Sequence, residues 1–371
     1  MTIRRVLSAT RRESWSDAVI PTVAIRAVIM VFAVLAVAVF HPDALPADPW
    51  LQVWNRWDAP HFFAIAAHWY LPPADPARIV LFPLYPMAIA LGSVVLQPLV
   101  AGMLVSLVAG LAAAVGLHRL VRLDDSRPAA RAAVVAMAIF PTAFAFIAPY
   151  SESLFVALSI WAFVRAREAD WRSAGVLGAL AAFTRLQGVF LLPALAIEFW
   201  LARRRLDRQV VWVASISVGL LAYLLVNYAT FGDALYFVGV QRDVFRVVNI
   251  APWDALGSLW QAVLTAKLDE SWVTIYLAPL AAFVVLGLTV VWTVASKHSR
   301  PSYAIYTVLN LAAFASLSWP ISVPRYLLGV FPVFLATGVL LRRPIGPAVG
   351  AASALLLGLF VTLFASGHWA F

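Results

Sequence analysis

The chain of 371 residues is 63% hydrophobic and only 12% charged, and its formal net charge is +9. Because a soluble domain carries about a quarter charged residues, this composition excludes a soluble protein and predicts a polytopic membrane protein. The positive charge gathers in short basic clusters between apolar runs, as the positive-inside rule expects, so we predict no nucleic-acid partner. The absence of cysteine excludes disulfides, a thiolate nucleophile and a cysteine-ligated metal.

The first predicted element is a transmembrane helix at residues 20–40, an apolar run that is too long for a signal peptide. A basic segment precedes it and predicts a cytoplasmic N-terminus. The arginines of this segment are Arg4, Arg5, Arg11 and Arg12. Residues 41–80, rich in proline, aspartate and tryptophan, form the first predicted external loop. The proline-broken stretch LFPLYPMAIALGSVV that follows predicts an interfacial or re-entrant segment.

Apolar runs separated by basic clusters continue along the rest of the chain. Further spans are predicted at about 98–118, 132–149, 151–165, 210–230, 272–295, 302–320, 326–341 and 347–366. Residues 173–201 are too few for two full spans between basic clusters, so we expect two short helices that meet inside the membrane near TRLQG. Residues 231–271 form the second predicted external loop.

These elements predict an all-α membrane protein: a bundle of about eleven transmembrane helices with short interfacial helices in the external loops. We expect one transmembrane domain over residues 1–371, with the N-terminus inside and the C-terminus outside. No internal repeat is evident, which disfavours a secondary transporter, because many of those proteins are built from inverted repeats.

Polar groups outside the cytoplasmic clusters gather on the predicted external face. Asp58 lies in VWNRWDAPHFF, close to Arg56 and His61. A carboxylate at this position can take a proton from a substrate hydroxyl, while the surrounding aromatic rings limit the access of water. The alternative is an aromatic belt at the membrane surface that contains an incidental salt bridge.

Three further charged residues lie at predicted span ends, where ionisable groups are costly and often functional. Glu152 in PYSESLF opens a helix, and capping of that helix by Ser151 or Glu152 is the simpler interpretation. Arg185 in TRLQG needs an anionic partner, which is either a protein carboxylate or a phosphate. Arg325 in SVPRYLL is placed similarly.

The second external loop contains Gln241, Arg242 and Arg246 in the stretch QRDVFR. Their spacing predicts that the two arginines share one helical face, where they repel unless an anion or a carboxylate lies between them. Asp243 can supply that carboxylate, so a solvated charged face is the alternative to a binding site. The six histidines show no metal-binding spacing, and no nucleotide-binding motif is present.

Several of these motifs occur in an order that resembles the PIG-V-like mannosyltransferases. The motifs are WDAPHFFAIAAHWY, LFPLYP, PYSESLF, TRLQG, FGDALYFVGVQ and PRYLLGVFPVF, within about residues 20–340. This family includes the second mannosyltransferase of GPI-anchor assembly and bacterial relatives. Phe62 stands where the family commonly has tyrosine, Leu81 where its FFPLYP motif begins with phenylalanine, and QRDVFR lacks the expected tryptophan.

The resemblance implies a C-type glycosyltransferase fold, with the active site on the non-cytoplasmic face and a polyprenyl- or dolichyl-phosphate mannose as donor. The family places an acidic residue of the first external loop at the site, and that position here is Asp58. If transfer inverts the anomeric carbon, one general base suffices, and Asp58 is that base. Arg56 and His61 would orient the carboxylate or contact the sugar.

The lipid-phosphate leaving group would need cationic stabilisation but no general acid. The candidate arginines are Arg185, Arg242, Arg246 and Arg325, and Glu152 and Gln241 complete the expected substrate-binding residues. We expect no cofactor and no obligatory metal.

Two other functions stay open: a transferase of the same fold that uses another lipid-phosphate sugar, and a lipid-linked sugar transporter. The expected partners are a lipid or glycan acceptor and the surrounding membrane lipids. The composition, rich in arginine and alanine, indicates a bacterial source and therefore the inner membrane.

Overall fold

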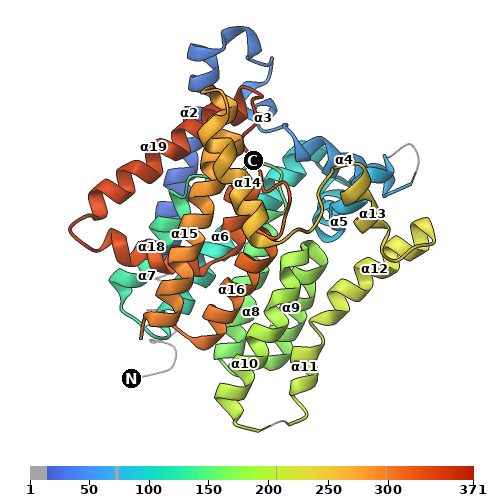
Figure 1. Ribbon diagram of the computed structural model, residues 1–371, viewed down its shortest axis with the longest axis vertical. Helices are drawn as coiled ribbons and strands as arrows, with labels where there is room; N and C mark the ends of the chain where they lie inside the picture. Colours follow the sequence, from blue (N-terminus) through green and yellow to red (C-terminus); the bar gives the residue numbers. More distant parts are fainter. Residues whose placement is uncertain (1–14, 72–74, 206, 298) are drawn as a thin grey trace.

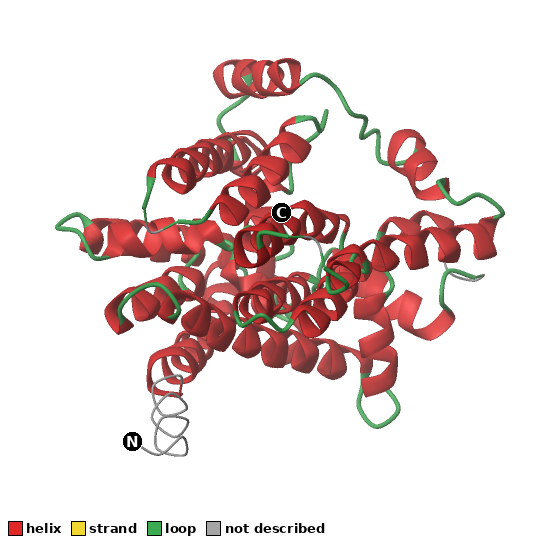
Figure 2. Ribbon diagram, turned by 90° about the horizontal axis from the view of Figure 1, so that it is seen from below, coloured by secondary structure: helices red, strands yellow, loops and turns green. Residues whose placement is uncertain are grey.

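The computed structural model describes residues 15–71, 75–205, 207–297 and 299–371. Within these ranges the chain forms helices and loops and contains no strand (Figure 2). One isolated antiparallel bridge joins Asn249 to Leu317. The all-helical class predicted from the sequence is therefore confirmed. The N-terminal arginines at positions 4, 5, 11 and 12 lie outside the described residues.

Six helical stretches of the described residues are long and apolar enough to span a membrane. They are Trp15–Phe40 (η1 Trp15–Val19 and α2 Ile20–Phe40), Pro98–Arg122 (α6), Leu186–Arg203 (η5 Leu186–Phe190 and α10 Leu191–Arg203), Val210–Phe231 (α11 Val210–Ala214 and α12 Ser217–Phe231), Trp272–Ala295 (η6 Trp272–Leu277 and α15 Ala278–Ala295) and Gly346–Ala365 (α19). A bent pair, Val323–Gly329 and Pro332–Leu341, makes a seventh if it counts as one span. A multi-pass membrane protein is confirmed, while the predicted number of eleven spans stays a prediction.

Shorter helices complete the bundle, and proline explains where several of them end. They are α7 (Arg127–Ala138), η4 (Ala143–Phe146), α8 (Glu152–Arg167), α9 (Trp171–Thr184), α16 (Pro301–Ala315), α17 (Val323–Tyr326), η7 (Leu327–Gly329) and α18 (Pro332–Leu341). The predicted span 132–149 is wrong as one helix, because α7 ends before Pro141 and a buried 3₁₀ turn follows. The predicted span 326–341 is likewise interrupted before Pro332, where the two parts bend by 91°.

The helix break predicted near TRLQG is confirmed, while its position inside the membrane stays a prediction. α9 ends at Thr184, Arg185 is extended with φ −156°, and the chain then continues through η5 into α10. α8 lies between α6, α9 and α10 and also contacts η7 (Figure 1). The break at Arg185 and the bend between η7 and α18 thus lie against the same central helix.

The two predicted external loops contain short helices, as expected, and meet at one end of the molecule (Figure 1). The first loop carries η2 (Pro42–Ala44), α3 (Pro49–Gln52), α4 (Asp58–His68) and η3 (Pro76–Val80), and α5 (Leu84–Gly92) follows. The second loop carries α13 (Tyr236–Asp243) and α14 (Pro252–Thr265). α4 packs on α5, and α13 packs on η3. Residues 248–250 pair with residues 316–318, just before α17.

Candidate functional site

Asp58 is the first residue of α4, and its carboxylate contacts an arginine that is distant in sequence. Oδ2 of Asp58 accepts a hydrogen bond from Nη1 of Arg325 at 2.6 Å. The residue before it, Trp57, has a positive φ of 53°, a conformation that costs a non-glycine residue about 1–3 kcal/mol and often marks a functional site. The helix N-terminus also favours the negative charge. The Asp58 side chain is 28% exposed and remains reachable from outside.

Arg325 is buried on α17 and lies between two carboxylates. Its Nη1 donates to Asp58, and its Nε lies 3.2 Å from Oε1 of Glu152. The ring of Tyr150 lies beneath the guanidinium, 4.6 Å from ring centroid to Cζ. Thr142 donates to the carbonyl of Pro324 at 3.1 Å and ties the α17 turn to the segment after α7.

Glu152 joins Arg325 to Arg185. Oε1 of Glu152 accepts a hydrogen bond from Nη1 of Arg185 at 2.7 Å, and the Glu152 side chain is only 2% exposed. The same Nη1 donates to Oγ of Ser151 at 3.0 Å. The interpretation of Ser151 or Glu152 as a helix cap is wrong, because Ser151 makes no capping bond and both side chains bind Arg185 instead. The protein carboxylate that Arg185 needs is therefore Glu152.

We call Asp58, Arg325, Glu152 and Arg185 the charge row. Acid and base alternate along it, so its formal charge sums to zero. Oε2 of Glu152 is buried and has no hydrogen-bond partner among the described residues. The row thus contains a buried carboxylate that is satisfied on one oxygen only and an outer carboxylate, Asp58, that faces the loop region.

Two further side chains adjoin the row although the sequence analysis did not select them. Gln187 accepts from Nε of Arg185 at 3.2 Å and donates to Oδ1 of Asn310 at 3.0 Å. Tyr326 places its ring 5.0 Å from the guanidinium carbon of Arg185. The TRLQG motif could have identified Gln187, which belongs to it, whereas nothing in the local sequence distinguishes Asn310.

Arg56 lies two residues before Asp58 but turns away from it. Its Nη2 donates to the carbonyl of Ala365 at 3.1 Å, and burial lowers the pKa of its guanidinium. Trp57 packs edge-on against Trp369, with 5.0 Å between ring centroids. Arg56 therefore fastens the first loop to the end of α19, and the cation beside Asp58 is Arg325.

His61 lies one turn after Asp58 on α4. Its Nδ1 accepts a hydrogen bond from Nε of Arg78 at 3.1 Å. Arg78 belongs to η3, which packs on α13. Arg78 is thus a further cation near the site, and no motif in the sequence singled it out.

The second-loop residues lie at the periphery. Arg242 pairs with its neighbour Asp243 at 2.7 Å, and both side chains are more than half exposed. α13 ends at Asp243, and Arg246 lies beyond it with φ 58°. The prediction that Arg242 and Arg246 share one helical face is therefore wrong. Gln241 is partly buried on α13, and its backbone carbonyl accepts a hydrogen bond from the N–H of Val247 at 2.9 Å.

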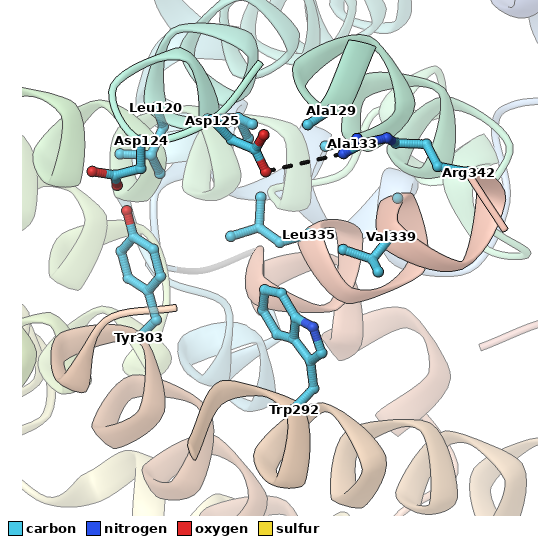
Figure 3. A pocket seen from close by; sticks show the side chains of 12 residues that line it. Leu120, Asp124, Asp125, Ala129, Ala133, Trp292, Tyr303, Leu335, Val339 and Arg342 are labelled. Atoms are coloured by element: carbon cyan, nitrogen blue, oxygen red, sulfur yellow. Dashed lines mark ion pairs between the residues drawn. The ribbon is translucent and has the colours of Figure 1, made fainter. Parts of the chain in front are cut away.

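The described residues contain no group of three histidine, aspartate or glutamate side chains that could hold a metal ion. A small cavity of about 40 Å³ lies elsewhere, between α6, α7, α15, α16 and α18 (Figure 3). Asp125 and Arg342 face each other across it at 4.0 Å, and Tyr303 and Trp292 line its other side. It has room for a few water molecules and not for a sugar.

Comparisons with known proteins agree with the motifs. No family model matches the chain. The chain is 35% identical over 148 residues to GPI alpha-1,6-mannosyltransferase 2 of Mus musculus, and the match covers 36% of this chain and 29% of the mouse protein. The chain thus matches less than a third of that relative's length. This similarity supports the resemblance to the PIG-V-like mannosyltransferases.

Among solved structures, the chain is similar to the oligosaccharyltransferase of Archaeoglobus fulgidus in the apo form. The TM-score is 0.44 and the sequence identity 13%, over 93% of this chain and 56% of that one. A likeness of this size does not establish a shared fold, so the C-type arrangement of the helices stays a prediction.

Proposed function

We propose that the chain is a membrane glycosyltransferase that moves mannose from polyprenyl-phosphate mannose to a lipid or glycan acceptor, with its site at the charge row. The observation that carries this proposal is the 2.6 Å contact between the partly exposed carboxylate of Asp58 and the buried guanidinium of Arg325. It places a group that can accept a proton beside a group that can bind a phosphate.

In the proposed reaction, the acceptor hydroxyl oxygen attacks the anomeric carbon of the donor from the face opposite the phosphate. The new glycosidic bond forms while the bond from the anomeric carbon to the phosphate oxygen breaks. The hydroxyl proton passes to Asp58, and the bonding electron pair leaves with the lipid phosphate. Arg325 and Arg185 would stabilise the negative charge of the departing phosphate.

The different burial of the two carboxylates supports transfer with inversion. Retention by double displacement needs a carboxylate that attacks the anomeric carbon as nucleophile, in addition to the base that takes the acceptor proton. Glu152 is only 2% exposed and lies behind Arg325, between two guanidiniums. Asp58 is the carboxylate of the row that a substrate can reach, which fits a single displacement with one base.

The same row would also serve another lipid-phosphate sugar. Its base would accept the hydroxyl proton and its arginines would bind the phosphate, and neither role depends on which sugar is transferred. Similarity to the mouse mannosyltransferase favours mannose. We also propose that the site opens to the extracytoplasmic side of a bacterial inner membrane, because Asp58, its exposed carboxylate, belongs to the first of the two loops that the basic clusters assign to that side.

The test is transfer of labelled mannose from polyprenyl-phosphate mannose in membranes that contain the protein, with native envelope extract as acceptor. We expect transfer by the wild type and a loss of about 10²–10⁴-fold in Asp58→Asn, the contribution of a general base. Asp43→Asn is the matched control, because Asp43 is an exposed acid of the same loop. Full activity of Asp58→Asn would refute the assigned base. Transfer only from another lipid-phosphate sugar would correct the donor, and no transfer from any would refute the function.

A further inference from the structure

An apolar groove runs along α6 and α8, outside the charge row. It is an open groove of about 670 Å³, and Leu177 of α9 lies at its edge. Leu104, Val108 and Ala112 line it from α6, and Leu154, Trp161 and Arg165 from α8. Arg165 is the one ionisable residue among those that line it. The groove therefore fits a hydrocarbon chain along most of its length and an anion at one end.

The length of the groove corresponds to one leaflet of a bilayer. From Leu154 to Arg165 the chain advances 165 − 154 = 11 residues along α8. At 1.5 Å per residue this distance is about 16 Å, or roughly half of the ~30 Å hydrocarbon core. An acyl chain of one leaflet has this reach, whereas a polyprenyl chain is much longer.

Trp161 forms a fixed platform at the charged end of the groove. Its indole N–H donates to the carbonyl of Ala112 at 2.8 Å. Gly116 leaves the space that the ring needs, because a Cβ there would lie 2.9 Å from the indole nitrogen. The guanidinium carbons of Arg165 and Arg119 lie 5.6 Å and 5.9 Å from this ring.

The two arginines keep a net positive charge at this platform. Both bind one carboxylate, that of Glu168, at 2.5 Å from Arg119 and 3.3 Å from Arg165. Their side chains are 49% and 38% exposed, so N–H donors remain free to meet a phosphate. Basic groups between membrane helices are a usual site for anionic lipid headgroups.

We propose that this groove binds an anionic phospholipid of the surrounding bilayer, with an acyl chain along α6 and α8 and the phosphate at Arg119 and Arg165. The occupant is not the sugar donor, since the cations lie at the end of α8 that is far from the charge row. Glu152 and Arg165 are 165 − 152 = 13 residues apart on one helix, which is about 20 Å. The inference does not depend on the proposed function.

The experiment measures binding of phosphatidylglycerol and phosphatidylcholine to the purified full chain by native mass spectrometry. The wild type is expected to bind phosphatidylglycerol more tightly than phosphatidylcholine. The double variant Arg119→Gln with Arg165→Gln removes both positive charges but keeps polar side chains, and it is expected to bind phosphatidylglycerol about thirtyfold more weakly. Arg343→Gln, an exposed arginine next to Arg342, serves as the control and is expected to bind as the wild type does.

A second variant tests the apolar part. Val108 is 64% exposed on the groove wall, so Val108→Trp narrows the groove without disturbing the core, and we expect weaker binding of both lipids. Val218→Trp changes a 55% exposed valine of α12 and is the matched control. Size-exclusion profiles check that each variant is folded.

Three results would overturn the proposal. Equal affinity of the wild type for the two lipids would show that the groove does not select an anionic headgroup. Unchanged phosphatidylglycerol binding by the double variant would show that Arg119 and Arg165 do not bind the phosphate. Displacement of phosphatidylglycerol by polyprenyl phosphate at equal concentration would assign the groove to the donor lipid instead.

Discussion

The two carboxylates of the charge row differ in how far a substrate can approach them. Asp58 is 28% exposed at the start of α4, whereas Glu152 is 2% exposed and lies between Arg185 and Arg325. A buried carboxylate in this position bridges two guanidiniums and fixes their direction, while the outer one lies where a substrate hydroxyl can approach it. In the proposed reaction, Glu152 is a positioning residue and Asp58 the catalytic residue.

Arg325→Lys tests whether the planar guanidinium is required. One ammonium group cannot match both the Nη1 contact with Asp58 and the Nε approach to Glu152. We expect mannose transfer to fall by about 10²–10³-fold, mainly in kcat. Arg208→Lys, at an exposed arginine between α10 and α11, should transfer like the wild type. A fully active Arg325→Lys would show that charge alone suffices.

Glu152→Gln tests the positioning role through stability. It leaves two guanidiniums in a buried place without their shared carboxylate, and removal of one partner of a buried pair costs about 3–5 kcal/mol. We expect a clear drop in the thermal unfolding temperature in detergent. Adding Arg185→Gln removes one of the stranded charges and should recover part of the loss, as a double-mutant cycle would measure. Additive effects would mean that the two side chains are not coupled.

At the scale of single elements, small residues decide how closely the helices approach. Arg26 of α2 is 6% exposed, and its Nη1 donates to the carbonyl of Leu107 on α6 at 2.9 Å. Its guanidinium lies where a Cβ on Gly110 would stand. Glycine at that point of α6 is therefore needed because an arginine crosses the helix surface there, and close helix contact at small residues is common in membranes.

Gly110→Ala should thus destabilise the protein. The added methyl group overlaps the buried Arg26 guanidinium, which must shift and thereby disturbs its hydrogen bond to the carbonyl of Leu107. We expect a loss of about 1–3 kcal/mol, measured as a lower unfolding temperature in detergent. Gly287→Ala on α15 is the control, since a Cβ there meets nothing within 4 Å. Equal effects of the two substitutions would contradict this account.

At the scale of the whole molecule, charged residues occupy both ends of the bundle. One end carries the charge row and the two loops. The other end carries a second set of ion pairs, in which Arg167 binds Asp124 at 2.6 Å and approaches Glu198 at 3.3 Å. Arg300 binds the same Glu198 at 2.6 Å. These pairs tie together the ends of α6, α8, α10 and α16, so the fold is fastened at the end opposite the proposed site.

The orientation of these two ends in the membrane can be tested because the chain has no cysteine. Asp43→Cys places a thiol in the first loop, and Arg208→Cys places one between α10 and α11; both positions are exposed. A membrane-impermeant maleimide applied to intact cells should label position 43 and should reach position 208 only after permeabilisation, because basic segments stay inside. The reverse pattern would place the charge row on the cytoplasmic side.

Much of the molecule follows from local patterns in the sequence. Apolar runs and basic clusters predict the helical membrane class, and the short interval between two basic clusters predicts the break at Arg185. These features depend on neighbouring residues, so composition and spacing are enough to locate them. Proline also ends helices through local contacts. The predicted span 132–149 nevertheless passes over the end of α7 before Pro141, because the apolar run continues beyond that proline.

The tertiary structure alone decides which charges meet. The partner of Asp58 is Arg325, which is 267 residues away, rather than the neighbouring Arg56. Likewise Glu152 pairs with Arg185 and Arg325 rather than capping its own helix. Local sequence marks each residue as costly to bury, but it cannot choose among distant partners. That choice depends on how α4, α8, α9 and α17 pack, because only packing brings their ends within hydrogen-bond distance.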